Sequence, residues 1–189
     1  MSTTPTLRQA TGPQYTRIHG LGAYRGDTLV TNDELAGPID SSDEWIRQRT
    51  GIITRAREQG GRNVVDMSTI AAQEAIEKAG IEPGRIGAVI LATITNMVQT
   101  PAAATRVCDN VGASPAAAYD ISAGCAGYCY AIAQADALVR SGVAEYVLVV
   151  GAEKLSDIVD PTDRSISFLL GDGAGAAIVG PADEPGIAE

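Results

Sequence analysis

The sequence has few of the residues on which several protein classes depend. Its 189 residues include three cysteines, one histidine, one tryptophan and one phenylalanine, and aromatic side chains make up 4% of the chain. An odd number of cysteines and the lack of a secretory signal pattern argue against a disulfide-rich secreted protein and favour a cytoplasmic one. No apolar run has the length that a membrane-crossing helix requires.

Basic residues are also scarce. Fourteen lysines and arginines stand against 23 aspartates and glutamates, which gives a formal net charge of -9. Affinity for nucleic acid comes largely from basic side chains that neutralise phosphates, so this balance excludes a general nucleic-acid binder. Any phosphate contacts are therefore expected to be local.

Apolar residues make up 45% of the chain, and alanine and glycine carry much of that share. This composition is globular and favours tight packing of helices on a sheet. Unbroken apolar runs at 86–94 and 146–150 are typical of parallel strands covered on both faces. Helical patterns at 64–79 and 101–111 alternate with them, which predicts an α/β domain with layered α/β/α architecture and a mostly parallel mixed sheet.

The ends of the chain differ from this central pattern. Residues 1–14 are polar and lack periodicity, which predicts a flexible leader. Residues 15–180 form one predicted domain, and the proline and glycine content of 181–189 is typical of the start of a linker.

Two local signals predict turns and helix starts. Ser41 and Glu44 have the spacing of a capping box ahead of a helix. Short apolar runs at 166–170 and 174–179 flank the sequence Gly-Asp-Gly, and this pattern predicts a hairpin.

The sequence SAGCAGY places Cys125 between small residues, after a predicted strand at 116–121 and at the start of a predicted helix at 125–139. Free N–H groups and the positive end of the dipole at a helix start stabilise a thiolate and a developing oxyanion. Local sequence leaves two interpretations open, a catalytic nucleophile and a small buried hydrophobe. Cys129 follows one turn later and is predicted to lie in the core; no histidine is near, so no metal site is predicted.

Five motifs follow one another along the chain: SSDEWI at 41–46, RTGI at 49–52, AGCAG at 123–127, DPTDR at 160–164 and GDGAGA at 171–176. Together they resemble the β-ketoacyl-acyl carrier protein synthase III family, which has a thiolase-like fold. The resemblance covers nearly the whole chain after the leader. Thiolase-like proteins consist of two similar halves that are related by a pseudo-twofold axis. The resemblance implies that this chain is the first, N-terminal half.

The resemblance implies an acyltransferase that initiates fatty acid synthesis in the cytoplasm. Cys125 would take an acyl group, usually acetyl, from acyl-coenzyme A. Malonyl-acyl carrier protein would then decarboxylate, and its carbanion would attack the acyl thioester. The implied partners are acyl-coenzyme A, malonyl-acyl carrier protein and a second subunit in a homodimer, and no cofactor is implied besides the coenzyme A thioester, which is a substrate.

Three further residues are implied to bind coenzyme A. Trp45 and Arg49 would sandwich the adenine, and Arg164 would meet the nucleotide end, through stacking and cation–π attraction. Without the resemblance, plainer interpretations stand: Trp45 as core, Arg49 as a solvated charge at a helix end, and Arg164 as the ion-pair partner of Asp160 or Asp163.

Thr100 falls where family members often carry a large aromatic residue that reaches across the dimer interface and caps the acyl pocket. Here the side chain is small. We expect a deeper pocket that accepts primers longer or more branched than acetyl.

The resemblance also implies a histidine and an asparagine downstream of Glu189 that stabilise the carbanion. The single histidine, His19, is instead predicted to be a partly buried residue of the first strand, at 15–24. We therefore expect the chain alone to be incomplete, with the C-terminal half of the same enzyme as a partner. The helix that begins at Cys125 is apolar nearly all round, as expected between two sheets, and would be exposed on one side here.

Several alternatives remain open. Inside the same fold they are a polyketide-priming or ester-forming ketosynthase and a hydroxymethylglutaryl-coenzyme A synthase. A noncatalytic half-domain that supplies dimer surface is the alternative from another class. For the acidic carrier protein, the arginines offer either a docking surface or an ordinary solvated face; we expect docking mostly outside this chain. They are Arg47, Arg49, Arg55, Arg57 and Arg62.

Overall fold

The computed structural model describes residues 11–187 and is built around a five-stranded sheet in the order β1-β7-β6-β4-β5. Its strands are β1 (Tyr15–Arg25), β4 (Ile86–Ala92), β5 (Ala117–Ile121), β6 (Tyr146–Lys154) and β7 (Asp172–Ala182). β4 pairs in parallel with β5 and β6, whereas β7 is antiparallel to both β6 and β1. Four strands therefore point one way and only β7 points back, which confirms the mostly parallel mixed sheet.

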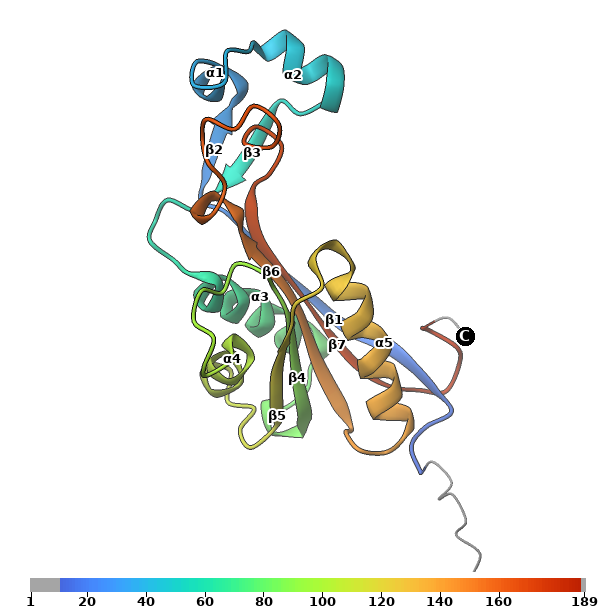
Figure 1. The fold of residues 1–189 in the computed structure, drawn as a ribbon. Coiled ribbons are helices and arrows are strands. Elements are labelled where there is room, and N and C mark those ends of the chain that lie inside the picture. The colour runs from blue at the N-terminus through green and yellow to red at the C-terminus, as the bar shows by residue number, and fades with distance from the viewer. Residues whose placement is uncertain (1–10, 188–189) are drawn as a thin grey trace, which may run out of the picture.

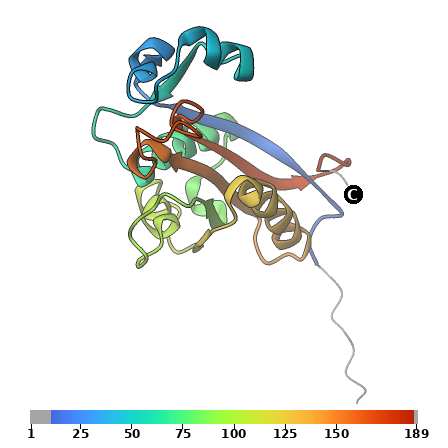
Figure 2. The same cartoon turned by 45° about the horizontal axis from the view of Figure 1, so that its top comes forward.

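Helices cover both faces of this sheet (Figures 1 and 2). α3 (Val64–Ala79) and α4 (Ala103–Asn110) pack on one face, and α5 (Gly127–Arg140) packs on the other. Alternate residues of the central strands serve the two cores: in β4, Val89 faces α3 and α4, whereas Ile90 faces α5. The layered α/β/α prediction is confirmed.

A smaller unit extends beyond the carboxyl end of β1 (Figure 1). It consists of β2 (Thr28–Thr31), α1 (Asn32–Ala36), α2 (Asp43–Thr50) and β3 (Thr54–Arg57), and β2 and β3 form an antiparallel pair. The N-cap of α2 is Ser42, whose hydroxyl accepts from the Trp45 N–H. The predicted capping box of Ser41 and Glu44 was therefore wrong by one residue.

The predicted hairpin at 166–180 was also wrong. Residues 158–171 form successive turns after a short 3-10 helix, η3 (Leu155–Asp157), and the following strand β7 pairs with β6 and β1 instead. Asp163 initiates these turns because its carboxylate accepts from the Ser165 N–H and its carbonyl accepts from the Ser167 N–H. The apolar run buries Phe168 against α1 and α2 rather than in a strand.

The structure describes only part of the predicted leader and linker. Residues 1–10 of the predicted leader lie outside the described residues, and residues 11–14 adopt no helix or strand. β7 continues to Ala182, so it extends two residues into the predicted linker. Within residues 11–187, no helix combines the length and apolarity needed to cross a membrane.

Close contact between β1 and α3 depends on glycine. A Cβ atom added to Gly22 would lie 2.0 Å from the Ala71 carbonyl oxygen, whereas one added to Gly175 on the adjacent strand would meet no atom within 4 Å. The backbone of α3 therefore rests directly on β1 at Gly22.

We predict that Gly22→Ala lowers the free energy of unfolding by about 1–3 kcal/mol, because overpacking forces the helix away from the sheet. Gly175→Ala, the matched control, should change it by less than about 0.5 kcal/mol. Urea denaturation of both variants measures the difference. Equal stabilities would show that α3 does not rest on β1 as described.

Candidate active site

All five predicted site residues follow the carboxyl ends of strands that share one direction. β1 leads to the unit with Trp45 and Arg49, β4 to Thr100, β5 to Cys125, and β6 to Arg164. In open α/β sheets, ligands bind at the carboxyl ends of the parallel strands. Strand direction alone thus brings these residues to one end of the sheet.

Cys125 lies in a single 3-10 turn, η2 (Gly124–Ala126), which joins β5 to α5, and its side chain is exposed. Gly124 has a φ of 50°, in the left-handed region that glycine tolerates. Gly127 starts α5 against β4, where an added Cβ would lie 2.9 Å from the Ala92 Cβ. Among the described residues no side chain caps this helix start. The N–H groups of Ala126 and Gly127 donate to the Ala123 and Gly124 carbonyls, whereas the Cys125 N–H has no acceptor among the described residues and can donate to an oxyanion.

α5 buries only one of its faces. Its buried positions are Gly127, Ala131, Ala135 and Val139, at intervals of four. Cys125 and Cys129 are displaced from this series by two positions, or about half a turn, and both are exposed. The core position predicted for Cys129 was therefore wrong, whereas the predicted exposure of one apolar face of this helix is confirmed.

Trp45, Arg49, Arg164 and Phe168 form a cluster that we call the Trp45 platform. The guanidinium carbon of Arg49 lies 4.1 Å from the centre of the Trp45 ring, and that of Arg164 lies 5.2 Å away. Phe168 packs edge-to-face on the indole at 5.4 Å. The structure thus brings Arg164 to Trp45 and Arg49, which lie more than 100 residues earlier in the chain, and cation–π attraction stabilises the arrangement.

Local contacts in α2 orient the platform. Arg49 lies one helical turn after Trp45, and Gly51, with a φ of 72°, ends the helix just beyond it. A hydrogen bond from Arg47, with a second from Asn32, holds the pKa of Asp43 below its usual range. Asp43 therefore carries a negative charge that other donors already satisfy.

Arg164 does not pair with the carboxylates named as its alternative partners. Asp160 accepts from Thr162 and Asp163 accepts from Ser165, which lowers the pKa of each carboxyl. Arg164 instead contacts the carboxylate of the exposed Asp40 at 3.8 Å. Its guanidinium thus remains open to an anion.

Thr100 is exposed in the segment that joins β4 to α4. Glu153 holds the start of this segment by accepting from Ile94 N–H and Thr95 Oγ1, and Asp120 holds its end by accepting from the N–H groups of Ala103 and Ala104. The N-cap residue of α4 is Ala102, which has no side-chain acceptor, so β5 supplies the cap. This explains why the helix begins two residues later than predicted.

The remaining candidates lie elsewhere or are already engaged. His19 is a half-buried residue of β1, at the opposite edge of the sheet from β5, and its Nε2 contacts the Pro181 carbonyl at 2.9 Å. Arg55 is buried, so the predicted arginine surface was wrong as a continuous solvated or docking face. Within residues 11–187, no group of three potential metal ligands occurs.

Sequence reasoning missed Phe168, Asp120 and Arg55. Phe168 is the only phenylalanine and lies in a turn-rich segment, so its burial was assigned to a strand. Asp120 caps a helix that precedes it in the chain. Only alternation along the short strand Thr-Arg-Ala-Arg could have suggested that Arg55 points inward.

Comparison with known proteins adds independent evidence. A family model described as 3-oxoacyl-[acyl-carrier-protein (ACP)] synthase III matches residues 119–189. Proteins named β-ketoacyl-[acyl-carrier-protein] synthase III are 53% identical in Kocuria rhizophila, over 96% of this chain and 51% of the relative, and 50% identical in Streptomyces glaucescens, over 96% and 54%. Over the half of these relatives that it spans, the chain is similar to β-ketoacyl-[acyl-carrier-protein] synthase III.

Solved structures agree with this similarity to synthase III and with the thiolase-like fold. The priming β-ketosynthase of the R1128 polyketide pathway matches with a TM-score of 0.92 at 42% identity, over 96% of this chain and 54% of its own. The synthase III of Aquifex aeolicus matches with a TM-score of 0.86 at 43% identity, over 89% and 55%. The chain thus spans about half the length of the synthase III relatives that it matches.

We predict that Asp120→Ala destabilises the protein by about 1–2 kcal/mol, because the first N–H groups of α4 lose their acceptor. The control is Asp109→Ala near the exposed carboxyl end of the same helix, where a lost negative charge should not destabilise. Thermal melts of both variants test this. Asp120→Ala with a wild-type melt would show that β5 does not cap α4.

Proposed function

We propose that this chain supplies the acyl-accepting half of a β-ketoacyl-acyl carrier protein synthase III. The observation that carries this proposal is an exposed cysteine at an uncapped helix start, at the same end of the sheet as an aromatic platform with two guanidiniums. The first group can take an acyl chain and the second can bind a nucleotide. Coenzyme A thioesters carry both parts in one molecule.

In the first half-reaction, the Cys125 thiolate attacks the thioester carbonyl of acyl-coenzyme A. The carbon–sulfur bond to coenzyme A breaks, and the coenzyme A thiolate leaves and takes a proton. The Cys125 N–H and the positive end of the α5 dipole stabilise the oxyanion between these events. An acyl-Cys125 intermediate results.

In the second half-reaction, malonyl-acyl carrier protein loses carbon dioxide, and the electron pair of the broken bond attacks the acyl-Cys125 carbonyl. The thiolate of Cys125 leaves and 3-ketoacyl-acyl carrier protein forms. Decarboxylation needs groups that stabilise an enolate oxygen. His19 cannot be one of them because it lies on β1, the edge strand opposite β5, where its Nε2 contacts the Pro181 carbonyl. We propose that the C-terminal half of the enzyme supplies them.

The Trp45 platform is the proposed site for the adenine nucleotide. Its indole offers a stacking surface, and Arg49 and Arg164 offer positive charge to phosphates. A planar guanidinium stacks on an adenine as readily as on an indole, so the base can enter between Trp45 and an arginine.

Two exposed features support the proposed protein partners. The outer face of α5, which begins just after Cys125, lies uncovered, as expected where the second half of the enzyme would pack. Ile94, Met97 and Val98 are exposed next to Thr100, with Met97 at 78%. β5 is an edge strand beside this segment, which favours a second copy of the chain as its partner in a homodimer. The proposed site of action is the cytoplasm.

A polyketide-priming ketosynthase is the second candidate function, because a solved structure with that name matches with a TM-score of 0.92. Both candidates use the same cysteine chemistry. They differ in the acyl primer, and therefore in the pocket that Thr100 would border.

We predict that incubation with acetyl-coenzyme A increases the mass of the chain by one acetyl group, and that Cys125→Ser abolishes this increase. Cys129→Ser is the matched control, since this thiol is also exposed and lies four residues further, in the first turn of α5, and the variant should still be acylated. Mass spectrometry of the intact chains measures the result. Acylation of Cys125→Ser, or none in the wild type, would contradict the proposal; carbon dioxide release from malonyl-acyl carrier protein by this chain alone would contradict the role given to the second half.

For primer length, we predict that Thr100→Phe reduces acylation by branched or longer acyl-coenzyme A at least about tenfold and leaves acetyl transfer nearly unchanged, because a large side chain fills the pocket. Thr100→Ser keeps a small side chain and should behave as wild type. Rates of acyl-enzyme formation in the homodimer with a series of primers test this. Strict acetyl selectivity in the wild type would exclude the deeper pocket.

A further inference from the structure

Arg55 is buried in the small unit formed by β2, α1, α2 and β3. Its side chain is 5% exposed, and its guanidinium donates to the Val30 carbonyl at 3.1 Å, to Asn32 Oδ1 at 2.5 Å and to the Phe168 carbonyl at 3.1 Å. Within residues 11–187 it forms no ion pair. Burial, with the nearby charge of Arg57, lowers the pKa of Arg55, although a guanidinium remains protonated at neutral pH.

The opposite charge that acts on Arg55 is that of Glu34, which is not in ion-pair contact with it, so burial of this guanidinium costs free energy. Apolar side chains of similar volume stabilise a core at least as well as buried ions do. What Arg55 provides instead is direction: its planar donors fix three acceptors from β2, α1 and the segment 158–171 relative to one another. Arg55 therefore serves to fix the relative positions of these three acceptors rather than to add to the free energy of unfolding.

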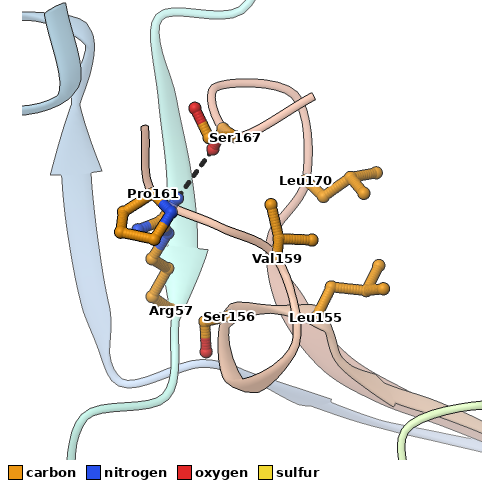
Figure 3. Close-up of a pocket in the computed structure, with 7 residues that line it drawn as sticks. All are labelled: Arg57, Leu155, Ser156, Val159, Pro161, Ser167 and Leu170. Atoms are coloured by element: carbon orange, nitrogen blue, oxygen red, sulfur yellow. Dashed lines mark hydrogen bonds between the residues drawn. The ribbon is translucent and has the colours of Figure 1, made fainter. Parts of the chain in front are cut away.

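Arg57 lies two residues further along β3 and makes a matching contact. Its Nη2 donates to the Ser167 carbonyl at 2.7 Å (Figure 3). Residues two apart on a strand point to the same side. The two arginines therefore hold consecutive carbonyls of one segment, those of Ser167 and Phe168.

Packing alone does not fix this segment. Beside the hydrogen bond of Arg57, a cavity of about 70 Å³ lies between parts of this segment and η3. Figure 3 shows the residues around the cavity, which are Arg57, Leu155, Ser156, Val159, Pro161, Ser167 and Leu170. Since a void offers no contact atoms on one side, hydrogen bonds carry more of the positioning here.

The held carbonyls are close in sequence to two members of the Trp45 platform. Phe168 carries the ring that packs against Trp45, and Arg164 is linked to the same turns because the Ser167 N–H donates to the Asp163 carbonyl at 3.0 Å. A shift of residues 167–168 would therefore move both the ring and the guanidinium relative to the indole.

We propose that Arg55 and Arg57 are positioning residues that hold Phe168 and Arg164 against Trp45 and so preform the nucleotide platform. This inference rests on the proposed function only for the identity of the ligand. The arrangement of the platform itself can be measured without one, because Trp45 is the only tryptophan of the chain.

The test uses Arg55→Lys and Arg57→Lys, which keep the charge and lose the planar donor geometry. Arg85→Lys is the matched control: Arg85 also donates to a partner, Glu145, and lies over an aromatic ring, that of Tyr146, outside the platform. Trp45 emission and its quenching by acrylamide report the platform directly. Titration with coenzyme A, followed by the same emission, reports its ligand affinity, and far-UV circular dichroism reports the fold.

We expect both variants to keep the wild-type circular dichroism and to show Trp45 more accessible to acrylamide. The dissociation constant for coenzyme A should rise about tenfold in Arg55→Lys, the effect of about 1.4 kcal/mol, and less in Arg57→Lys. Arg85→Lys should match the wild type in every measurement.

Wild-type acrylamide quenching in a folded Arg55→Lys would overturn the inference. If Arg55→Lys does not fold, Arg57→Lys decides in the same way. If coenzyme A leaves the emission of the wild type unchanged, the proposed function fails at this site, whereas the acrylamide result still decides whether the arginines position the platform.

Discussion

The common direction of β1, β4, β5 and β6 is the constraint on which the site depends. β7 runs against its neighbours β6 and β1, and this reversal lets β1 join the sheet in the same direction as β6. The segments that follow the carboxyl ends of these four strands therefore all start at one end of the sheet (Figure 1). A parallel β7 would have sent the Trp45 unit to the opposite end, away from Cys125.

The helix α5 shows how one periodicity can serve packing and chemistry together. Small residues at every fourth position bury one face on the sheet, and the glycine at its start allows the backbone to approach β4. The same periodicity turns Cys125 outward. Because the four buried residues are small, two of them alanine, the helix lies close to the sheet, and its uncovered face remains apolar enough to pack against a second layer.

Periodicity and motifs predicted much of this structure. The limits of α3 were predicted to the residue, and the strands at 86–94 and 146–150 differ only in their carboxyl ends. Three of the failures share a cause: Phe168, Arg55 and the cap of α4 each depend on a partner that is distant in sequence. Motif resemblance named Trp45, Arg49 and Arg164, but neither periodicity nor resemblance could show which buried groups hold them together.

The net charge of -9 opposes the binding of a phosphorylated nucleotide at the proposed site, but the charges near that site differ from the average. The carboxylates of Asp43, Asp160 and Asp163 accept from neighbouring side chains and N–H groups, and Asp40 is fully exposed at 3.8 Å from Arg164. The two guanidiniums on Trp45 therefore keep their donors available. Exposed charges beyond about 8 Å are largely screened at physiological ionic strength, so these near contacts outweigh the acidic surface elsewhere.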